Sequence, residues 1–163
     1  MTTDPQTDKQ PPNPPESLTS EGGRFAIVAS RFNAQVVDRL VEGALEAFQS
    51  TGTTPDRVRV VRVPGAFELP LAVGCLLDTG DYDAVVALGC VVRGETPHFE
   101  YVSRTASDGL GRVSLDYGIP VGFGLLTTDN VEQAMARAGG DAGNKGFDAA
   151  IAAIEMTQLL GDL

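Results

Sequence analysis

The chain alternates short apolar runs with longer amphipathic segments, and this alternation is the feature that most constrains its fold. Four runs have the length and β-branched content of buried strands, at residues 24–30, 58–63, 83–90 and 119–127. Segments with helical periodicity follow them, at about residues 33–51, 67–77, 96–115, 129–139 and 145–160. The order βαβαβαβαα predicts an α/β fold, a three-layer αβα sandwich around an open, parallel, four-stranded sheet with right-handed crossovers.

Polar residues at the starts of these segments predict where the helices begin. Asn33 is placed to cap the first helix, and Thr96 with Pro97 fits the N-cap and N1 positions of the third. Asp129 and Glu132 have the three-residue spacing of a capping-box variant. Each of these starts lies shortly after a predicted strand, which agrees with the alternation.

Residues 1–22 differ in composition from the rest of the chain. They contain five of the ten prolines and almost no large apolar side chains, so burial cannot offset the entropy of ordering them. We expect a disordered or polyproline II tail there. The remaining residues, 23–163, are enough for a single domain with one core.

Charge and composition exclude several classes of function. The chain carries a net charge of −10 and no cluster of lysines and arginines, which argues against nucleic acid as a partner. Its longest apolar runs are strand-sized, short of the roughly 20 residues of a membrane helix, and its start lacks the pattern of a signal peptide. Two cysteines, Cys75 and Cys90, and one histidine are too few for a zinc site. We therefore expect a cytoplasmic protein without a metal, its cysteines buried in the core.

Function is expected at the carboxyl ends of the strands, where ligands bind in open parallel sheets. The segments at these ends are residues 30–33, 64–68, 91–98 and 127–129. In the third segment, Gly94 lets a ligand approach the backbone, and the amides of Glu95 and Thr96 lie at a helix N-terminus, which favours anions. Taken alone, this loop is explained equally well by a phosphate site and by an ordinary glycine turn.

His98 lies in the first turn of the helix that follows this loop. The positive end of the helix dipole favours a neutral imidazole, which can accept a proton. A surface histidine without a role is the usual alternative. The neighbouring candidate anion site favours general acid/base catalysis instead.

Two other strand-end segments carry candidate ligand-binding residues. Phe32, Ala66, Phe67 and Glu68 can supply an aromatic face, backbone hydrogen bonds and one carboxylate to a flat polar heterocycle. As alternatives, the two phenylalanines are core residues and the glutamate only complements a helix dipole.

Two cations, Arg137 and Lys145, flank a glycine-rich connection at residues 139–143. A cation in the last turn of a helix is favourable in any protein, so Arg137 alone signals little. In a chain this acidic, two cations beside such a loop are candidate phosphate clamps.

Five longer strings of residues go beyond these general features. They are GRFAIVASRFN, VRVPGAFELP, ALGCVVRGETPHFEYV, FGLLTTDNVEQAMARAG and AGNKGFDAAIAAIEM. In order and spacing the chain resembles the lumazine synthase family over about residues 23–160, most specifically in PGAFE, RGETPHF and AGNKG. That family has a flavodoxin-like fold.

The resemblance implies an enzyme of riboflavin biosynthesis, a transferase that needs neither cofactor nor metal. It would condense 5-amino-6-(D-ribitylamino)uracil with 3,4-dihydroxy-2-butanone 4-phosphate to 6,7-dimethyl-8-ribityllumazine, phosphate and water. By matching position, the pyrimidine and ribityl chain would contact Phe32, Ala66, Phe67, Glu68, Val91, Val92 and Phe123. The phosphate would contact Gly94, Glu95, Thr96 and Arg137, and the catalytic residues would be His98, Arg137 and Lys145.

The resemblance also implies homo-oligomers, with active sites between adjacent subunits. Phe123, Arg137 and Lys145 match residues that a neighbouring subunit contributes. Family members form pentamers, and many bacterial members form a shell of twelve pentamers. Riboflavin synthase is a candidate partner. The proline-rich tail departs from the family's pattern, because proline cannot donate to the edge strand that some members add to a neighbour.

Rival functions fit parts of the sequence. A non-catalytic flavin- or nucleotide-binding protein would use residues 94–96 only to cradle a phosphate, and would bind ligand without turnover. A purely structural shell would not explain why His98, Arg137 and Lys145 coincide with the family's positions. A response-regulator receiver is excluded, because it needs acidic residues where this chain has Ser-Arg-Phe at residues 30–32.

Overall fold

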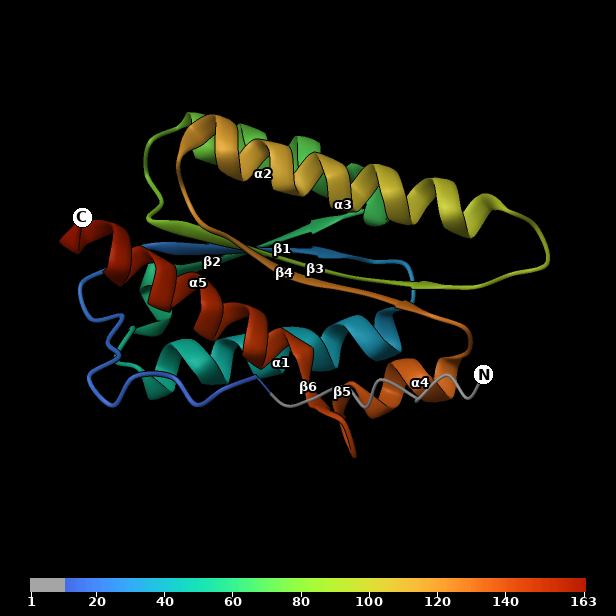
Figure 1. The fold of residues 1–163 in the computed structure, drawn as a ribbon, viewed down its shortest axis with the longest axis horizontal. Helices are drawn as coiled ribbons and strands as arrows, with labels where there is room; N and C mark the ends of the chain where they lie inside the picture. The colour runs from blue at the N-terminus through green and yellow to red at the C-terminus, as the bar shows by residue number, and fades with distance from the viewer. Residues whose placement is uncertain (1–10) are drawn as a thin grey trace, which may run out of the picture.

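Four parallel strands form one open sheet in a computed structural model that describes residues 11–163 (Figure 1). The strands are β1 (Phe25–Ser30), β2 (Val58–Val63), β3 (Ala84–Val92) and β4 (Val121–Thr128). Their order is β2-β1-β3-β4, so β1 and β3 are central and β2 and β4 are edges. In register, Phe25 of β1 is beside Val58 of β2 and Ala84 of β3, and Val85 of β3 is beside Val121 of β4. The predicted parallel sheet is confirmed.

Helices cover both faces of the sheet and complete the predicted sandwich (Figure 1). One face carries α1 (Ala34–Ser50), α4 (Val131–Ala136) and α5 (Lys145–Asp162). The other carries α2 (Leu69–Asp78) and α3 (His98–Tyr117). Two short 3-10 helices, η1 (Pro55–Arg57) and η2 (Ala66–Glu68), precede β2 and α2. None of the helices among the described residues has the length and apolar character to cross a membrane.

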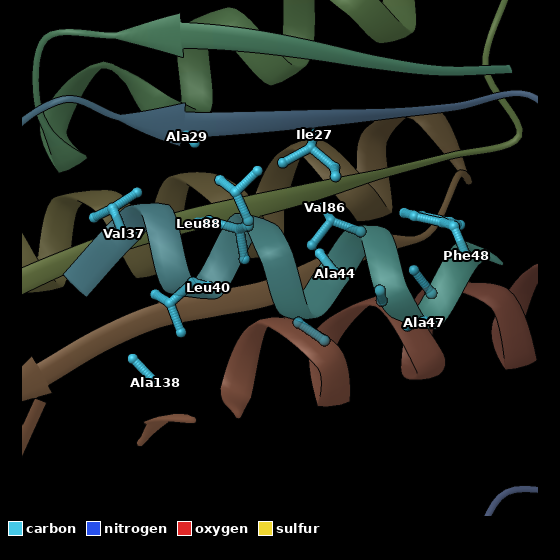
Figure 2. Close-up of a cluster of buried hydrophobic side chains, with 14 of the residues drawn as sticks. Ile27, Ala29, Val37, Leu40, Ala44, Ala47, Phe48, Val86, Leu88 and Ala138 are labelled. Atoms are coloured by element: carbon cyan, nitrogen blue, oxygen red, sulfur yellow. The ribbon is translucent and has the colours of Figure 1, made fainter. Parts of the chain in front are cut away.

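The core has two parts, one on each face of the sheet, because successive strand residues point to opposite sides. On the α1 side, Ile27 of β1 and Val86 and Leu88 of β3 belong to one cluster with Leu40 and Phe48 of α1 (Figure 2). These five side chains are at most 1% exposed. On the opposite side, the intervening strand residues pack with residues of α2 and α3. Burial on both faces explains the nearly uniform apolar sequence of β3.

Asn33 precedes α1 as predicted, but its side chain makes no capping bond. The residue has a left-handed backbone, with φ 57°, and its Nδ2 donates to the carbonyl oxygen of Cys90 at 2.8 Å. The side chain therefore ties the β1–α1 junction to β3 rather than to its own helix. The predicted cap is wrong because an N-cap side chain usually projects from an extended backbone, as at Asn130 and Asn144, and Asn33 is left-handed.

The starts of α3 and α4 each differ from the prediction by one residue. Pro97, not Thr96, is the N-cap residue, and His98 is the first residue of α3. At α4 the cap is Asn130 instead of Asp129, because its Oδ1 accepts from the backbone N–H of Gln133 at 2.9 Å. His98 remains in the first turn, so the shift leaves its predicted position at the helix start unchanged.

A small antiparallel hairpin, β5 (Ala138–Gly140) with β6 (Gly143–Asn144), lies between α4 and α5. The sequence pattern predicts only a helix end and a glycine-rich connection here. Gly139 and Gly143 adopt positive φ angles of 93° and 79°, which glycine allows at little cost. The hairpin is so short that alternation of apolar and polar residues cannot reveal it.

Part of the predicted tail packs against the domain. Ser20 is 4% exposed, its N–H donates to the carbonyl oxygen of Thr51 at 2.8 Å, and its own carbonyl accepts from Thr53 Oγ1 at 3.1 Å. The ordered chain therefore begins before residue 23, because polar groups at the end of α1 provide partners that composition does not reveal. The prediction for residues 1–10 lies outside the described residues.

Candidate active site

A pocket of about 570 Å³ lies at the carboxyl ends of β1, β2 and β3, beside the start of α3. This volume is typical of small-molecule sites. The pocket brings together nine residues predicted from the sequence, namely Phe32, Ala66, Phe67, Glu68, Val91, Val92, Gly94, Thr96 and His98. Four residues that the sequence analysis missed complete its lining, Gly65, Cys90, Phe99 and Val102. Glu95 does not belong to the lining.

The two phenylalanines of the pocket are exposed rather than part of the core. Phe32 is 69% exposed and Phe67 is 59% exposed. Phe32 lies two residues after the end of β1, and its N–H donates to the carbonyl oxygen of Pro64 at 3.1 Å, which holds the β1–α1 loop beside the β2–α2 loop. The alternative interpretation as core residues is wrong for both. An aromatic face at the pocket is suited to stacking on a flat heterocycle.

Glu68 is held by the turn on which it lies. Its Oε2 accepts a hydrogen bond from the N–H of Gly65 at 3.0 Å, which closes the start of η2. A carboxylate has two oxygens with several lone pairs, so this bond leaves acceptor capacity for a ligand. Glu68 therefore supports the local turn and lines the pocket at the same time.

The loop after β3 is exposed from Arg93 to His98. A Cβ added to Gly94 would meet nothing within 4 Å, so packing within the chain does not require glycine there. Close approach of a ligand to the backbone would require it. The N–H of His98 lies 3.4 Å from Thr96 Oγ1, at the start of α3. The loop thus combines a helix N-terminus, which favours anions, with an imidazole at the same pocket.

Arg93 is a candidate that the sequence analysis missed. It lies directly before Gly94, and its Nε donates to Asp129 Oδ1 of the β4–α4 loop at 2.9 Å. This hydrogen bond, together with a weaker interaction with Glu100, raises the pKa of Arg93 and keeps the guanidinium charged. An arginine beside a candidate anion loop was a signal in the sequence, but its partner lies 36 residues away.

The two cysteines lie in different environments. Cys90 is 2% exposed, as predicted, and burial raises the pKa of its thiol to about 11. This thiol therefore stays protonated at neutral pH, which argues against a nucleophilic role. Cys75 is exposed on α2, so its predicted burial is wrong. It lies in an apolar helical stretch whose periodicity leaves its position on the outer side.

The three remaining predicted residues, Phe123, Arg137 and Lys145, line a different groove of about 820 Å³. This groove runs along the edge strand β4 and α5, and among the described residues its lining shares no member with the first pocket. Lys145 Nζ lies 3.3 Å from Asp148 Oδ2, and Arg137 Nη1 donates to the carbonyl oxygen of Gln133 at 3.0 Å. Within one chain, the structure does not bring these cations to the pocket of His98.

The start of α5 fixes the position of Lys145. Asn144 Oδ1 accepts from the N–H groups of Gly146 and Phe147 at 2.9 and 3.1 Å, while its Nδ2 donates to the carbonyl oxygen of Arg39 at 2.9 Å. At Gly146 an added Cβ would collide with the backbone of α1. The AGNKG string therefore encodes a capped helix start packed tightly against α1.

Large apolar side chains are exposed along the second groove. Leu115 is 85% exposed, Phe123 is 52% exposed, and Met156 and Leu160 are each 42% exposed. They lie beside β4, an edge strand of the sheet that the described residues form. Exposed apolar surface of this kind is typical of sites that bind another protein, a membrane or a ligand.

Comparison with known proteins agrees with this geometry. The sequence model of the 6,7-dimethyl-8-ribityllumazine synthase family matches residues 22–161. Proteins of that name from two strains of Nitratidesulfovibrio vulgaris, DP4 and Hildenborough, are each 51% identical over 146 residues, covering 90% of this chain and 94% of the relative. The one from Desulfatibacillum aliphaticivorans is 52% identical over 143 residues, covering 88% and 92%. The chain belongs to the 6,7-dimethyl-8-ribityllumazine synthase family.

Proposed function

We propose that this chain catalyses the condensation of 5-amino-6-(D-ribitylamino)uracil with 3,4-dihydroxy-2-butanone 4-phosphate to 6,7-dimethyl-8-ribityllumazine, phosphate and water. Family membership supports the reaction. The observation that carries the proposal is the 570 Å³ pocket, in which an exposed aromatic ring, a carboxylate, a helix N-terminus and His98 share one cavity. These are the groups that a flat, polar heterocycle and a phosphate ester require.

In this proposal the pocket holds the pyrimidine substrate. Its ring stacks on Phe32, and the η2 segment binds the ring edge and the ribityl hydroxyls through backbone groups of Ala66 and Phe67 and through the Glu68 carboxylate. Val91 and Val92, at the end of β3, supply an apolar wall. A flat apolar slot with few polar groups orients a heterocycle without requiring additional charges.

The phosphate of the second substrate lies at the start of α3 in the proposed complex. Gly94 allows close approach, the amides of Glu95 and Thr96 donate to the phosphate, and Arg137 neutralises its charge. His98, the first residue of α3, moves protons. Imine formation, phosphate elimination and ring closure each need a proton moved near this point, so one imidazole can serve all three steps. Holding both substrates in register lowers the activation free energy by roughly 7–11 kcal/mol, which supplies much of the acceleration.

Because Arg137, Lys145 and Phe123 lie on the second groove, the proposed site is completed by a second copy of the chain. The exposed apolar residues beside β4 support this arrangement. We propose a closed pentamer, in which the groove of each copy meets the pocket of the next. Light scattering distinguishes about 86 kDa for five chains from about 1,030 kDa for a shell of sixty, at 17.1 kDa per chain.

The activity is tested by mixing the purified protein with both substrates and recording the lumazine chromophore. Wild-type protein is expected to form it, and no product under any condition would overturn the proposed function. A second experiment tests the shared site. His98→Ala removes the proton carrier from the pocket. Arg137→Ala removes a phosphate-binding cation from the groove, which raises the apparent KM for the butanone phosphate.

The two variants are then produced together in equal amounts and assayed at a low concentration of butanone phosphate. If each site takes its pocket from one chain and its groove from another, about a quarter of the sites contain two intact halves. Activity should therefore return to about a quarter of the wild-type value. If the mixture shows only the summed activities of the separate variants, the site lies within one chain and the shared-site proposal is wrong.

A further inference from the structure

The loop that carries the proposed phosphate amides and His98 has little support from the core. Residues 93–98 are all exposed, and a Cβ added to Gly94 would meet nothing within 4 Å. A loop that must present amides to an anion in a fixed arrangement needs another source of order. Ordering a flexible loop on binding costs free energy, which weakens the affinity for the anion.

Arg93 makes contacts that meet this need. Its N–H donates to the carbonyl oxygen of Thr128 at 2.8 Å, which extends the β3–β4 ladder past the end of β3. Its guanidinium then reaches Asp129 Oδ1 through Nε at 2.9 Å and approaches Glu100 Oε1 through Nη1 at 3.5 Å. The guanidinium carbon also lies 4.5 Å from the ring centroid of Phe99.

These contacts join the two ends of the loop. Arg93 begins it, while Phe99 and Glu100 lie in the first turn of α3, directly after His98. Asp129 belongs to the neighbouring loop after β4, which provides an external anchor. A planar guanidinium offers its face to a ring and its edge donors to carboxylates in one fixed arrangement, whereas the compact ammonium of lysine has no such planar fork.

We infer that Arg93 is a positioning residue, which holds the loop at residues 94–98 in its anion-binding shape through Asp129, Glu100 and Phe99. This inference rests on the proposed function. Arg93 is not part of the pocket lining, so it acts through the loop rather than on the substrates. Its side chain is 49% exposed, and exposed ion pairs contribute little to stability, so its main effect is on loop geometry.

The test compares Arg93→Lys and Asp129→Ala with matched controls on a surface pair of α3. Arg112 and Asp116 form an exposed pair at 3.5 Å, remote from the loop along the same helix, so Arg112→Lys and Asp116→Ala make the same chemical changes. In the assembled enzyme, Arg93→Lys and Asp129→Ala should each raise the KM for the butanone phosphate about tenfold and lower kcat. The KM for the pyrimidine, the unfolding temperature and both control variants should stay at their wild-type values.

Binding of inorganic phosphate, measured by titration calorimetry, gives a second readout that does not depend on turnover. Arg93→Lys and Asp129→Ala should both bind phosphate more weakly than wild type. Wild-type kinetic constants and phosphate affinity in both variants would overturn the inference, and so would an equal rise in both KM values with a lower unfolding temperature. If wild-type protein forms no lumazine, the proposed function fails separately. The phosphate affinities of the variants then decide alone whether Arg93 positions the loop.

Discussion

Substitution of Asn33 separates two contributions that a single residue makes to the junction beside the pocket. Its Nδ2 donates to the carbonyl oxygen of Cys90 at 2.8 Å, and its φ of 57° lies in the left-handed region. Loss of the hydrogen bond costs about 0.5–1.5 kcal/mol. Alanine at this backbone conformation costs about 1–2 kcal/mol more, which glycine avoids. Glycine instead adds an entropic cost of roughly 0.5–1 kcal/mol in the unfolded chain.

Asn33→Ala should therefore lower the free energy of unfolding by about 1.5–3.5 kcal/mol. Asn33→Gly should lower it less, by about 1–2.5 kcal/mol. Asn33→Asp tolerates the left-handed backbone but places a carboxylate against the Cys90 carbonyl, so it should also be destabilising. The assay is urea unfolding at one fixed protomer concentration, since assembly would make the stability depend on concentration.

Two results would refute this reasoning. If Asn33→Ala is as stable as Asn33→Gly, the positive φ is not a constraint in the folded protein. If Asn33→Gly is as stable as wild type, the bond to the Cys90 carbonyl contributes nothing. Each result removes one of the two contributions and leaves the other intact.

Three further predictions concern catalysis, packing and pH. His98→Ala should slow turnover while both substrates still bind, and unchanged kcat would remove His98 from the mechanism. Gly109→Ala places a Cβ 2.7 Å from Pro70 Cγ of α2 and should destabilise the fold by about 1–3 kcal/mol. Gly111→Ala, in open space on the same helix, should stabilise the fold slightly. Thermal unfolding of the two variants compares these effects, and equal unfolding temperatures would contradict the packing of Gly109 against Pro70. The raised pKa of Cys90, about 11, means that its protonated thiol stabilises the fold below about pH 9 and that this contribution, on the order of 2 kcal/mol, is lost as the pH rises towards 11. Urea unfolding between these pH values should show this loss in wild type but not in Cys90→Ala, and parallel curves would argue against it.

Elements whose pattern reflects burial could be predicted from the sequence. The strands and the long helices follow from apolar periodicity, because both faces of the sheet must be covered. Helix starts were less predictable, since Asp129 and Asn130 are both good capping residues and only the packed structure shows which one reaches the N–H of Gln133. Asn33 was assigned the wrong partner for the same reason, because its amide reaches a carbonyl 57 residues away.

The candidate site could be predicted in composition but not in arrangement. Loops after parallel strands must meet at one edge, so the nine residues of the pocket follow from topology. Spacing along the chain does not show whether Arg137, at the end of α4, and Lys145, at the start of α5, join them, and only the family resemblance assigned both to a neighbouring subunit. Arg93 was missed because its role depends on Asp129, a contact that only the β3–β4 pairing creates.

The topology supports the proposal that the active site is shared between two copies of the chain. The central strands β1 and β3 end in loops that face one another, so they enclose a pocket within one chain. Among residues 11–163, β4 is an edge strand of the sheet, and Phe123 and the apolar residues of α5 beside it are exposed. Covering that edge with a second copy would bury apolar surface, which favours association. In the proposed assembly the same contact would carry Arg137 and Lys145 to a neighbour's pocket. Subunit association and completion of the active site would then be one event, and ligands bound between copies would stabilise the oligomer.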